Sequence, residues 1–122
     1  ETSVSRGLGD VYKRQSLEDK VFFDFDKSTL NNDTKKILSQ YVAESEKAKI
    51  IRLEGHCDER GTREYNLALG EKRAIEVKNY LIIQGVSSSK IKIISYGEEK
   101  PISFGSTESD WKQNRRVEIA LF

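Results

Sequence analysis

The chain has 122 residues, of which 36% are hydrophobic and 34% are charged, and its formal net charge is +1. This length suits one globular domain, and no apolar run approaches the roughly 20 residues that a membrane-spanning helix needs. The near-neutral charge argues against a nucleic-acid binder that relies on bulk positive charge. A single Cys and a single His exclude an internal disulfide and a structural zinc site.

The N-terminal segment is expected to lie outside the fold. Residues 1–15 show neither helical nor strand periodicity, and the chain does not begin with Met. Within this segment, SRGLGDVYKRQ at residues 5–15 resembles a translated transposase-based sequencing adapter. The alternative is a disordered linker that follows a lipid anchor. We therefore expect residues 1–15 to be a non-native or disordered leader and residues 16–122 to form the domain.

The first half of the domain predicts a strand followed by a helix. Residues 21–26 are short, aromatic and β-branched, which predicts a strand with Val21 and Phe25 on the same face. Residues 33–47 carry apolar side chains at helical spacing, which predicts a helix. Asn32, directly before them, is the expected N-cap.

A second strand and a second helix follow in the middle of the chain. Residues 50–57 predict a strand whose alternation places His56 and Cys57 on opposite faces. Residues 64–84 predict a helix, which Gly85 is expected to end. The expected buried stripe of this helix is Tyr65, Leu69, Ala74, Val77 and Leu81.

The last third of the chain predicts two more strands around a short helix. Residues 90–96 and 117–122 are the strands, and residues 107–113 form the helix that carries Trp111. The predicted order is β-α-β-α-β-(α)-β. The economical packing of these elements is an α/β (α+β) two-layer sandwich, with two long helices on one face of a four-stranded mixed sheet.

Four motifs stand in a fixed order along these elements. They are FFDFDKS at residues 22–28, GHCDERGTREYNLALGEKRA at 55–74, SYGEEKP at 95–101 and NRRVEI at 114–119. Together they closely resemble the OmpA C-terminal-like family of peptidoglycan-binding domains. The fuller run DERGTREYNLALG looks like the peptidoglycan-associated lipoprotein (Pal) branch of that family in particular. The resemblance covers residues 20–122.

The resemblance implies non-covalent binding of the peptidoglycan stem peptide, with no catalytic residue, cofactor or metal. The family's ligand is meso-diaminopimelate, whose free end carries one ammonium and one carboxylate. The family's key acid and base fall on Asp58 and Arg73, and Asn66, Phe25 and Asp26 match positions that line the same pocket. The resemblance also implies a lipid anchor in the outer membrane, a periplasmic location, and docking of TolB in the Tol-Pal system.

The residues themselves make that assignment geometrically sensible. Asn66 and Arg73 are seven positions apart on one predicted helix, so they share a face. Gly70 between them costs about 1 kcal/mol of helix stability relative to Ala, which fits a position that something must approach closely. The guanidinium of Arg73 can bind a carboxylate through two parallel hydrogen bonds, and the carboxylate of Asp58 can pair with an ammonium. The alternative is a structural salt bridge between Asp58 and Arg73.

Catalytic interpretations of the same region are less favourable. Because His56 and Cys57 point to opposite faces of a strand, the imidazole is badly placed as a base for the thiol, and Cys57 is expected to pack under a helix. Glu54 and Asp58 are expected on one face at a separation near that of a glycosidase pair, but so small a domain shows no evident cleft.

Two other functional alternatives stay open. One is a protein-interaction module that mainly docks TolB and binds the wall weakly. The other is the periplasmic domain of a different OmpA-family parent, such as a barrel porin or a flagellar stator protein. Arg115 and Arg116 are expected near the pocket rim without being primary ligands.

Overall fold

The computed structural model describes residues 19–122 of the chain, so the leader predicted for residues 1–15 lies outside the described residues. The predicted order of elements is confirmed within the described part. In chain order the elements are β1 (Lys20–Phe22), α1 (Asn32–Lys47), β2 (Ile51–His56), α2 (Arg63–Ile83), the 3-10 helix η2 (Ser88–Lys90), β3 (Ile91–Gly97), α3 (Glu108–Asn114) and β4 (Arg116–Leu121).

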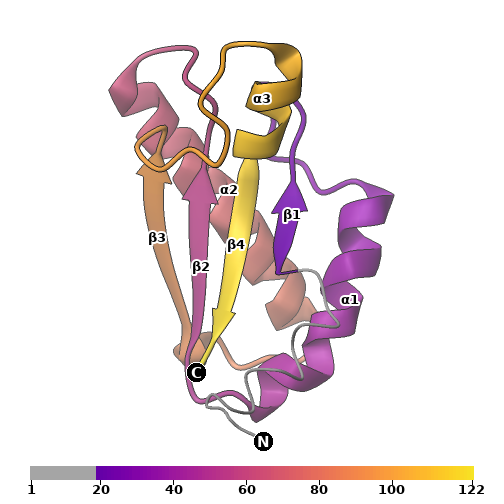
Figure 1. Ribbon diagram of the computed structural model, residues 1–122. Coiled ribbons are helices and arrows are strands. Elements are labelled where there is room, and N and C mark those ends of the chain that lie inside the picture. The colour runs from indigo at the N-terminus through magenta and orange to yellow at the C-terminus, as the bar shows by residue number, and fades with distance from the viewer. Residues whose placement is uncertain (1–18) are drawn as a thin grey trace, which may run out of the picture.

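The strands form one mixed sheet in the order β1-β4-β2-β3. Strands β2 and β3 are parallel and are joined by α2, whereas β4 is antiparallel to both β1 and β2. A parallel pair needs such a crossover connection, and an apolar helix face then covers one side of the sheet. Figure 1 shows α2 crossing behind the strands and α1 beside β1. The expected sandwich is therefore confirmed.

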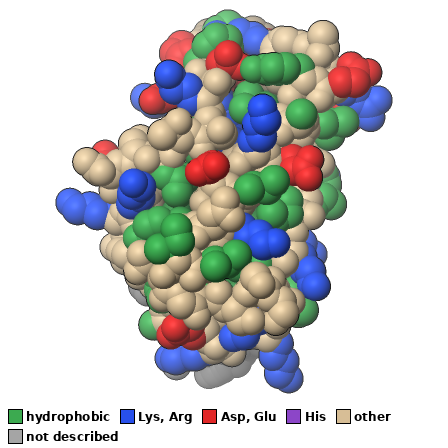
Figure 2. Space-filling model, turned by 180° about the vertical axis from the view of Figure 1, so that it is seen from behind, with side chains coloured by type: hydrophobic (Ala, Val, Ile, Leu, Met, Phe, Trp, Pro, Cys, Tyr) green, Lys and Arg blue, Asp and Glu red, His purple; other side chains and the backbone are tan. Residues whose placement is uncertain are grey.

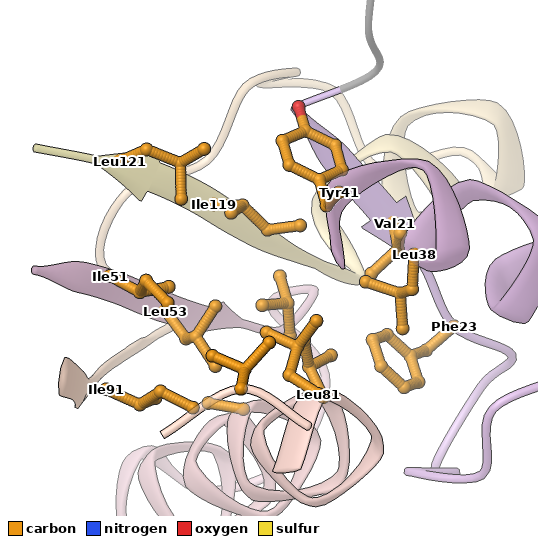
Figure 3. Close-up of a cluster of buried hydrophobic side chains, with 14 residues drawn as sticks. Val21, Phe23, Leu38, Tyr41, Ile51, Leu53, Leu81, Ile91, Ile119 and Leu121 are labelled. Carbon is orange, nitrogen blue, oxygen red and sulfur yellow. The ribbon is translucent and has the colours of Figure 1, made fainter. Parts of the chain in front are cut away.

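The hydrophobic core lies between the sheet and the two long helices. Figure 3 shows Leu38 and Tyr41 of α1 and Leu81 of α2 facing the strands, among a cluster of 14 buried side chains. On the helical side of the molecule, the surface carries small hydrophobic groups separated by charged side chains (Figure 2). Within residues 19–122, every helix is too short or too polar to cross a membrane.

Local capping sets the helix ends. The side chain of Asn31 accepts a hydrogen bond from the backbone N–H of Thr34 at 2.8 Å, so the N-cap of α1 is Asn31 and the prediction of Asn32 was wrong by one residue. Thr62 caps α2 in the same way. At the other end of α2, Gly85 has a φ of 106° and ends the helix as predicted.

Gly55 of β2 and Gly70 of α2 bring the helix directly against the sheet. A Cβ atom on Gly55 would lie 1.8 Å from the carbonyl oxygen of Gly70, and a Cβ on Gly70 would lie 3.0 Å from the carbonyl oxygen of Gly55. The close approach predicted at Gly70 is therefore made by the backbone of β2. A Cβ fits at neither position unless its neighbours shift.

The first strand is shorter than predicted. It ends at Phe22, and Phe23 keeps one further contact through its N–H, which donates to the carbonyl of Arg115 at 2.9 Å. A turn follows, in which Asp26 has a φ of 57°. Because of this turn, Phe25 does not share the buried face of Val21. It is 53% exposed and stands at the end of the sheet, where the candidate site lies.

Candidate functional site

A pocket of about 240 Å³ lies where β2 ends and α2 begins. Its walls come from the loop after β1, the loop after β2 and the N-terminal half of α2. The lining residues are Phe25, Asp26, Cys57, Asp58, Arg60, Gly61, Tyr65, Asn66, Leu69 and Arg73. All five residues that the resemblance implied are therefore brought to one pocket. Their part in ligand binding stays a prediction.

Arg73 lies at the inner wall of this pocket and is completely buried. Its guanidinium donates to three backbone carbonyls, those of Asp24 at 3.0 Å, Lys27 at 2.7 Å and His56 at 3.0 Å. Burial lowers the pKa of Arg73 from its ordinary value, although an arginine remains protonated at neutral pH. Among residues 19–122, the ion pairs include no carboxylate partner for Arg73. The pocket wall therefore holds a buried cation without a matching anion.

Asp58 is also buried, but it is already paired. Its carboxylate accepts from the Arg60 side chain at 2.9 Å and 3.2 Å and from the Arg60 backbone N–H at 3.0 Å. Arg115 lies 3.5 Å away. Burial raises the pKa of Asp58, but the hydrogen bonds and charge of Arg60, with the charge of Arg115, outweigh it and hold the pKa below its ordinary value. Asp58 is therefore ionised at neutral pH, and the alternative of an Asp58–Arg73 salt bridge was wrong.

The two arginines that face Asp58 were not predicted as its partners: Arg115 was expected only near the pocket rim, and Arg60 was not singled out. Arg115 is buried, and it also donates to the carbonyl of Phe23 at 2.8 Å and to Glu108 at 2.9 Å. Arg60 is partly exposed, and its guanidinium lies 3.9 Å from the ring centroids of both Phe25 and Trp111. The spacing of Asp58 and Arg60 was visible in the sequence, but nothing local indicated which cation would reach the carboxylate.

Asn66 holds the loop after β2 in place. Its Nδ2 atom donates to the carbonyl of Arg60 at 2.9 Å and to Glu98 at 2.7 Å, and lies 3.3 Å from the carbonyl of Asp58. Asn66 and Arg73 share the buried face of α2, as their spacing predicted. The amide of Asn66 therefore holds the backbone of Asp58 and Arg60 in position, and Asn66 also lines the pocket.

The outer rim of the pocket is formed by the loop after β1 and the first turn of α2. The hydroxyl of Tyr65 donates to the carboxylate of Asp26 across the rim. Tyr65 is 51% exposed, so its predicted place in the buried stripe of α2 was wrong. The hydrogen bond explains this orientation, because it draws the ring from the core to the mouth of the pocket.

His56 and Cys57 point to opposite sides of the sheet, as predicted. The Cys57 thiol donates to the carbonyl of Asn66 at 3.3 Å on the helical side, and the His56 ring stacks on Tyr96 with centroids 5.4 Å apart. Burial raises the pKa of Cys57 to about 11, which keeps the thiol protonated. A protonated thiol is a poor nucleophile, so the geometry does not favour catalysis by this pair.

The carboxylates are not arranged as a hydrolytic pair. Glu54 pairs with Arg52 at 2.8 Å and does not line the pocket of Asp58, so the expectation that the two acids share a face was wrong. Strand β2 ends at His56, so Asp58 lies in the loop beyond it, where the alternation of a strand no longer applies. Within residues 19–122, no group of three or more His, Cys, Asp or Glu side chains is placed to hold a metal ion.

Comparison with known proteins places the chain in a family. A family model described as OmpA family matches residues 22–115. A protein of Pseudomonas aeruginosa named peptidoglycan-associated lipoprotein is 46% identical over 99 residues, which are 80% of this chain and 59% of that protein. The protein of the same name from Mesorhizobium japonicum is 43% identical over 109 residues, 87% of this chain and 64% of the relative.

A solved structure agrees with these matches. The crystal structure of the peptidoglycan-associated lipoprotein from Burkholderia pseudomallei superposes with a TM-score of 0.82 at 37% identity, covering 86% of this chain and 91% of that one. The chain therefore belongs to the OmpA family. Within it, the chain is similar to the peptidoglycan-associated lipoproteins, which confirms the resemblance of the motifs. It spans about 60% of the length of the two relatives described above.

Proposed function

We propose that this domain binds the peptidoglycan stem peptide through the zwitterionic end of meso-diaminopimelate and does no chemistry on it. The observation that carries the proposal is the buried guanidinium of Arg73, which lines the pocket without a carboxylate partner among residues 19–122. A buried charge is costly unless it is paired, and a ligand carboxylate would supply the missing anion.

The donors of Arg73 agree with this role. A guanidinium has five N–H groups, and three of them are used by backbone carbonyls. One of the remaining two has only the weak acceptor Cys57 Sγ, at 3.5 Å. These two N–H groups can donate to the carboxylate of the ligand. The ionised Asp58 in the same pocket would then accept from the ligand ammonium.

We also propose a cellular role, on the basis of the names of the relatives. The relatives are named peptidoglycan-associated lipoproteins, so we place the parent protein at the periplasmic face of the outer membrane, held by a lipid anchor on the N-terminal side of the domain. There it would tether the outer membrane to the cell wall as part of the Tol-Pal system. The high identity to these relatives favours such a parent over a barrel porin or a flagellar stator protein.

Docking of TolB is the second candidate function, and one surface feature favours it. Phe104 is 84% exposed in the loop between β3 and α3, and with Glu59 it lines a second pocket next to the loop that carries Asp58. An exposed aromatic side chain beside a pocket is a typical anchor for a protein partner. Recovery of the domain on isolated sacculi and on immobilised TolB would rank the two functions.

The first prediction concerns the charge of Asp58. Removing one partner of a buried charge pair costs about 2–5 kcal/mol, so Asp58→Asn should weaken binding of a meso-diaminopimelate muropeptide by about 30-fold or more in calorimetry. The matched control is Asp33→Asn in the first turn of α1, outside the pocket. It should leave the affinity within about twofold, because the two sites share no partners. Equal affinities of the wild type and Asp58→Asn would contradict the assignment.

The second prediction tests Arg73 from the side of the ligand. Arg73 holds three backbone carbonyls, so replacing it would also disturb the fold. A lysine-type muropeptide retains the ammonium and lacks the terminal carboxylate, which leaves Arg73 unpaired. The wild-type domain should therefore bind it about 30-fold more weakly than the meso-diaminopimelate peptide. Affinities within a few-fold of each other would refute the zwitterion mechanism.

A further inference from the structure

The carboxylate that the proposed ligand needs is occupied by the protein itself. Asp58 accepts three hydrogen bonds from Arg60, one from its backbone and two from its guanidinium. Arg115 stands on the other side, 3.5 Å away. A ligand ammonium added to this arrangement would place a third cation against one buried carboxylate. Three of the roughly four acceptor sites of this carboxylate are already used, so a full ammonium site requires one of the two resident guanidiniums to give way.

The geometry identifies which of them can move. The side chain of Arg115 is 6% exposed and is fixed by the carbonyl of Phe23 and by Glu108. The side chain of Arg60 is 31% exposed, and it stands in a short loop between β2 and α2. Arg60 also lies 4.0 Å from Glu108, which offers a second carboxylate at the surface. Moving Arg60 therefore costs less than moving Arg115.

Two hydrogen bonds next to Arg60 do not involve its side chain. Its guanidinium lies over the ring of Phe25 and over the ring of Trp111, at 3.9 Å from each centroid. Trp111 is held separately, because its indole N–H donates to Glu59 at 3.2 Å. The backbone N–H of Arg60 would still donate to Asp58 after the side chain has left. Displacement of the side chain thus exposes the acid and an aromatic slot beside it.

We propose that Arg60 is an internal competitor for the ammonium subsite: its guanidinium occupies Asp58 in the ligand-free domain and is displaced when a ligand ammonium binds. This inference rests on the proposed function. The competitor lowers the affinity for any ammonium ligand by the same factor, since it reduces the fraction of domains whose acid is free. Discrimination between ligands is then left to Arg73, which reads the carboxylate.

The test compares the full chain with Arg60→Gln by calorimetry, using the meso-diaminopimelate muropeptide and the lysine-type muropeptide as probes. Arg60→Gln should bind both peptides about fivefold more tightly or more, and the ratio between them should not change. The matched control is Arg63→Gln, which removes the same charge from the same end of the domain. Arg63 pairs with Glu99 at 2.6 Å and does not line the pocket, so its affinity should equal that of the wild type.

The measured affinities distinguish failure of the competitor role of Arg60 from failure of the proposed function. Equal or weaker binding by Arg60→Gln, with a wild type that binds, would overturn the competitor and leave the proposed function standing. Binding by Arg60→Gln alone would support the competitor strongly. Binding by neither protein would refute the proposed function and the competitor with it. Circular dichroism on both variants verifies that they are folded.

Fluorescence gives a second readout from the same samples. The chain has one Trp, and Arg60 stacks on it, so displacement of Arg60 should change the emission of Trp111. The emission of ligand-free Arg60→Gln should already differ from that of the ligand-free wild type in the same direction. An emission that stays constant while the wild type is saturated would show that Arg60 does not leave, and would overturn the inference.

Discussion

Gly55→Ala should cost the domain about 3 kcal/mol of unfolding free energy or more, a large part of the 5–15 kcal/mol typical of a domain. The new Cβ would meet the carbonyl oxygen of Gly70 at 1.8 Å; the Cβ is fixed directly to the strand backbone, and the oxygen belongs to the helix backbone. No side-chain rotation relieves such a contact. The helix α2 must therefore move away from β2 and lose packing along the whole interface. Urea unfolding followed by circular dichroism measures the loss.

The reciprocal substitution provides the control. In Gly70→Ala the nearest atom is the Ser95 hydroxyl, at 2.4 Å, which can rotate if it gives up its hydrogen bond to the carbonyl of Leu67. Alanine also gains about 1 kcal/mol over glycine within a helix. The cost of Gly70→Ala should therefore be clearly smaller. An equal or larger loss in Gly70→Ala would mean that the backbone contact at Gly55 does not set the distance between helix and sheet.

A second large effect is expected from pH. His56 is 2% exposed, and within the described residues neither ring nitrogen has a hydrogen-bond partner. Burial, with the charges of Arg116 and Lys100 working against that of Glu118, lowers its pKa to about 4 from the ordinary value of 6.5. Between pH 4 and pH 6.5 the His56 ring is protonated in the unfolded chain and neutral in the folded domain. Stability is therefore full above pH 6.5 and is lost as the pH falls toward 4.

The expected loss is about 2 kcal/mol between pH 7.5 and pH 5, where most carboxylates are still ionised. Since the chain contains one His, His56→Leu should remove this dependence and leave a nearly flat profile over the same range. Urea midpoints measured at half-unit steps of pH for both proteins provide the test. Parallel profiles for the wild type and His56→Leu would assign the loss to other groups.

The sequence predicted the architecture well because most elements carry their own signals. Helix α2 is the clearest case, since apolar spacing marks its length and Gly85 marks its end. Strand β1 was overestimated for a physical reason. Alternation predicts that a segment is extended, but the turn at Asp26 is stabilised by the distant Tyr65 and by the bond from Arg73 to the carbonyl of Lys27. Such contacts leave no trace in the local pattern.

In the candidate site too, some features could be predicted from the local sequence and others depend on tertiary contacts. The motifs placed Asp58 and Arg73 in one pocket, but they did not reveal that the two residues have separate partners. Asp58 pairs with Arg60 because the intervening loop folds back on itself, and with Arg115 because β4 lies next to β2. Arg73 donates to three uncharged backbone carbonyls and, more weakly, to the sulfur of Cys57. Pairing of this kind is decided by the tertiary fold and cannot be inferred from spacing.

Under the proposed function, in which the domain tethers a membrane to a wall, the position of β1 would have a mechanical consequence. In Figure 1 the described chain enters β1 at the end of the strand opposite the pocket, which lies near α3 and the start of α2. An anchor on the N-terminal side would pull β1 along its own axis while the ligand pulls the other way. The hydrogen bonds between β1 and its antiparallel partner β4 would then be loaded together, in shear, and would not open one at a time. Loading of this kind would divide the force among all the hydrogen bonds of the three-residue strand.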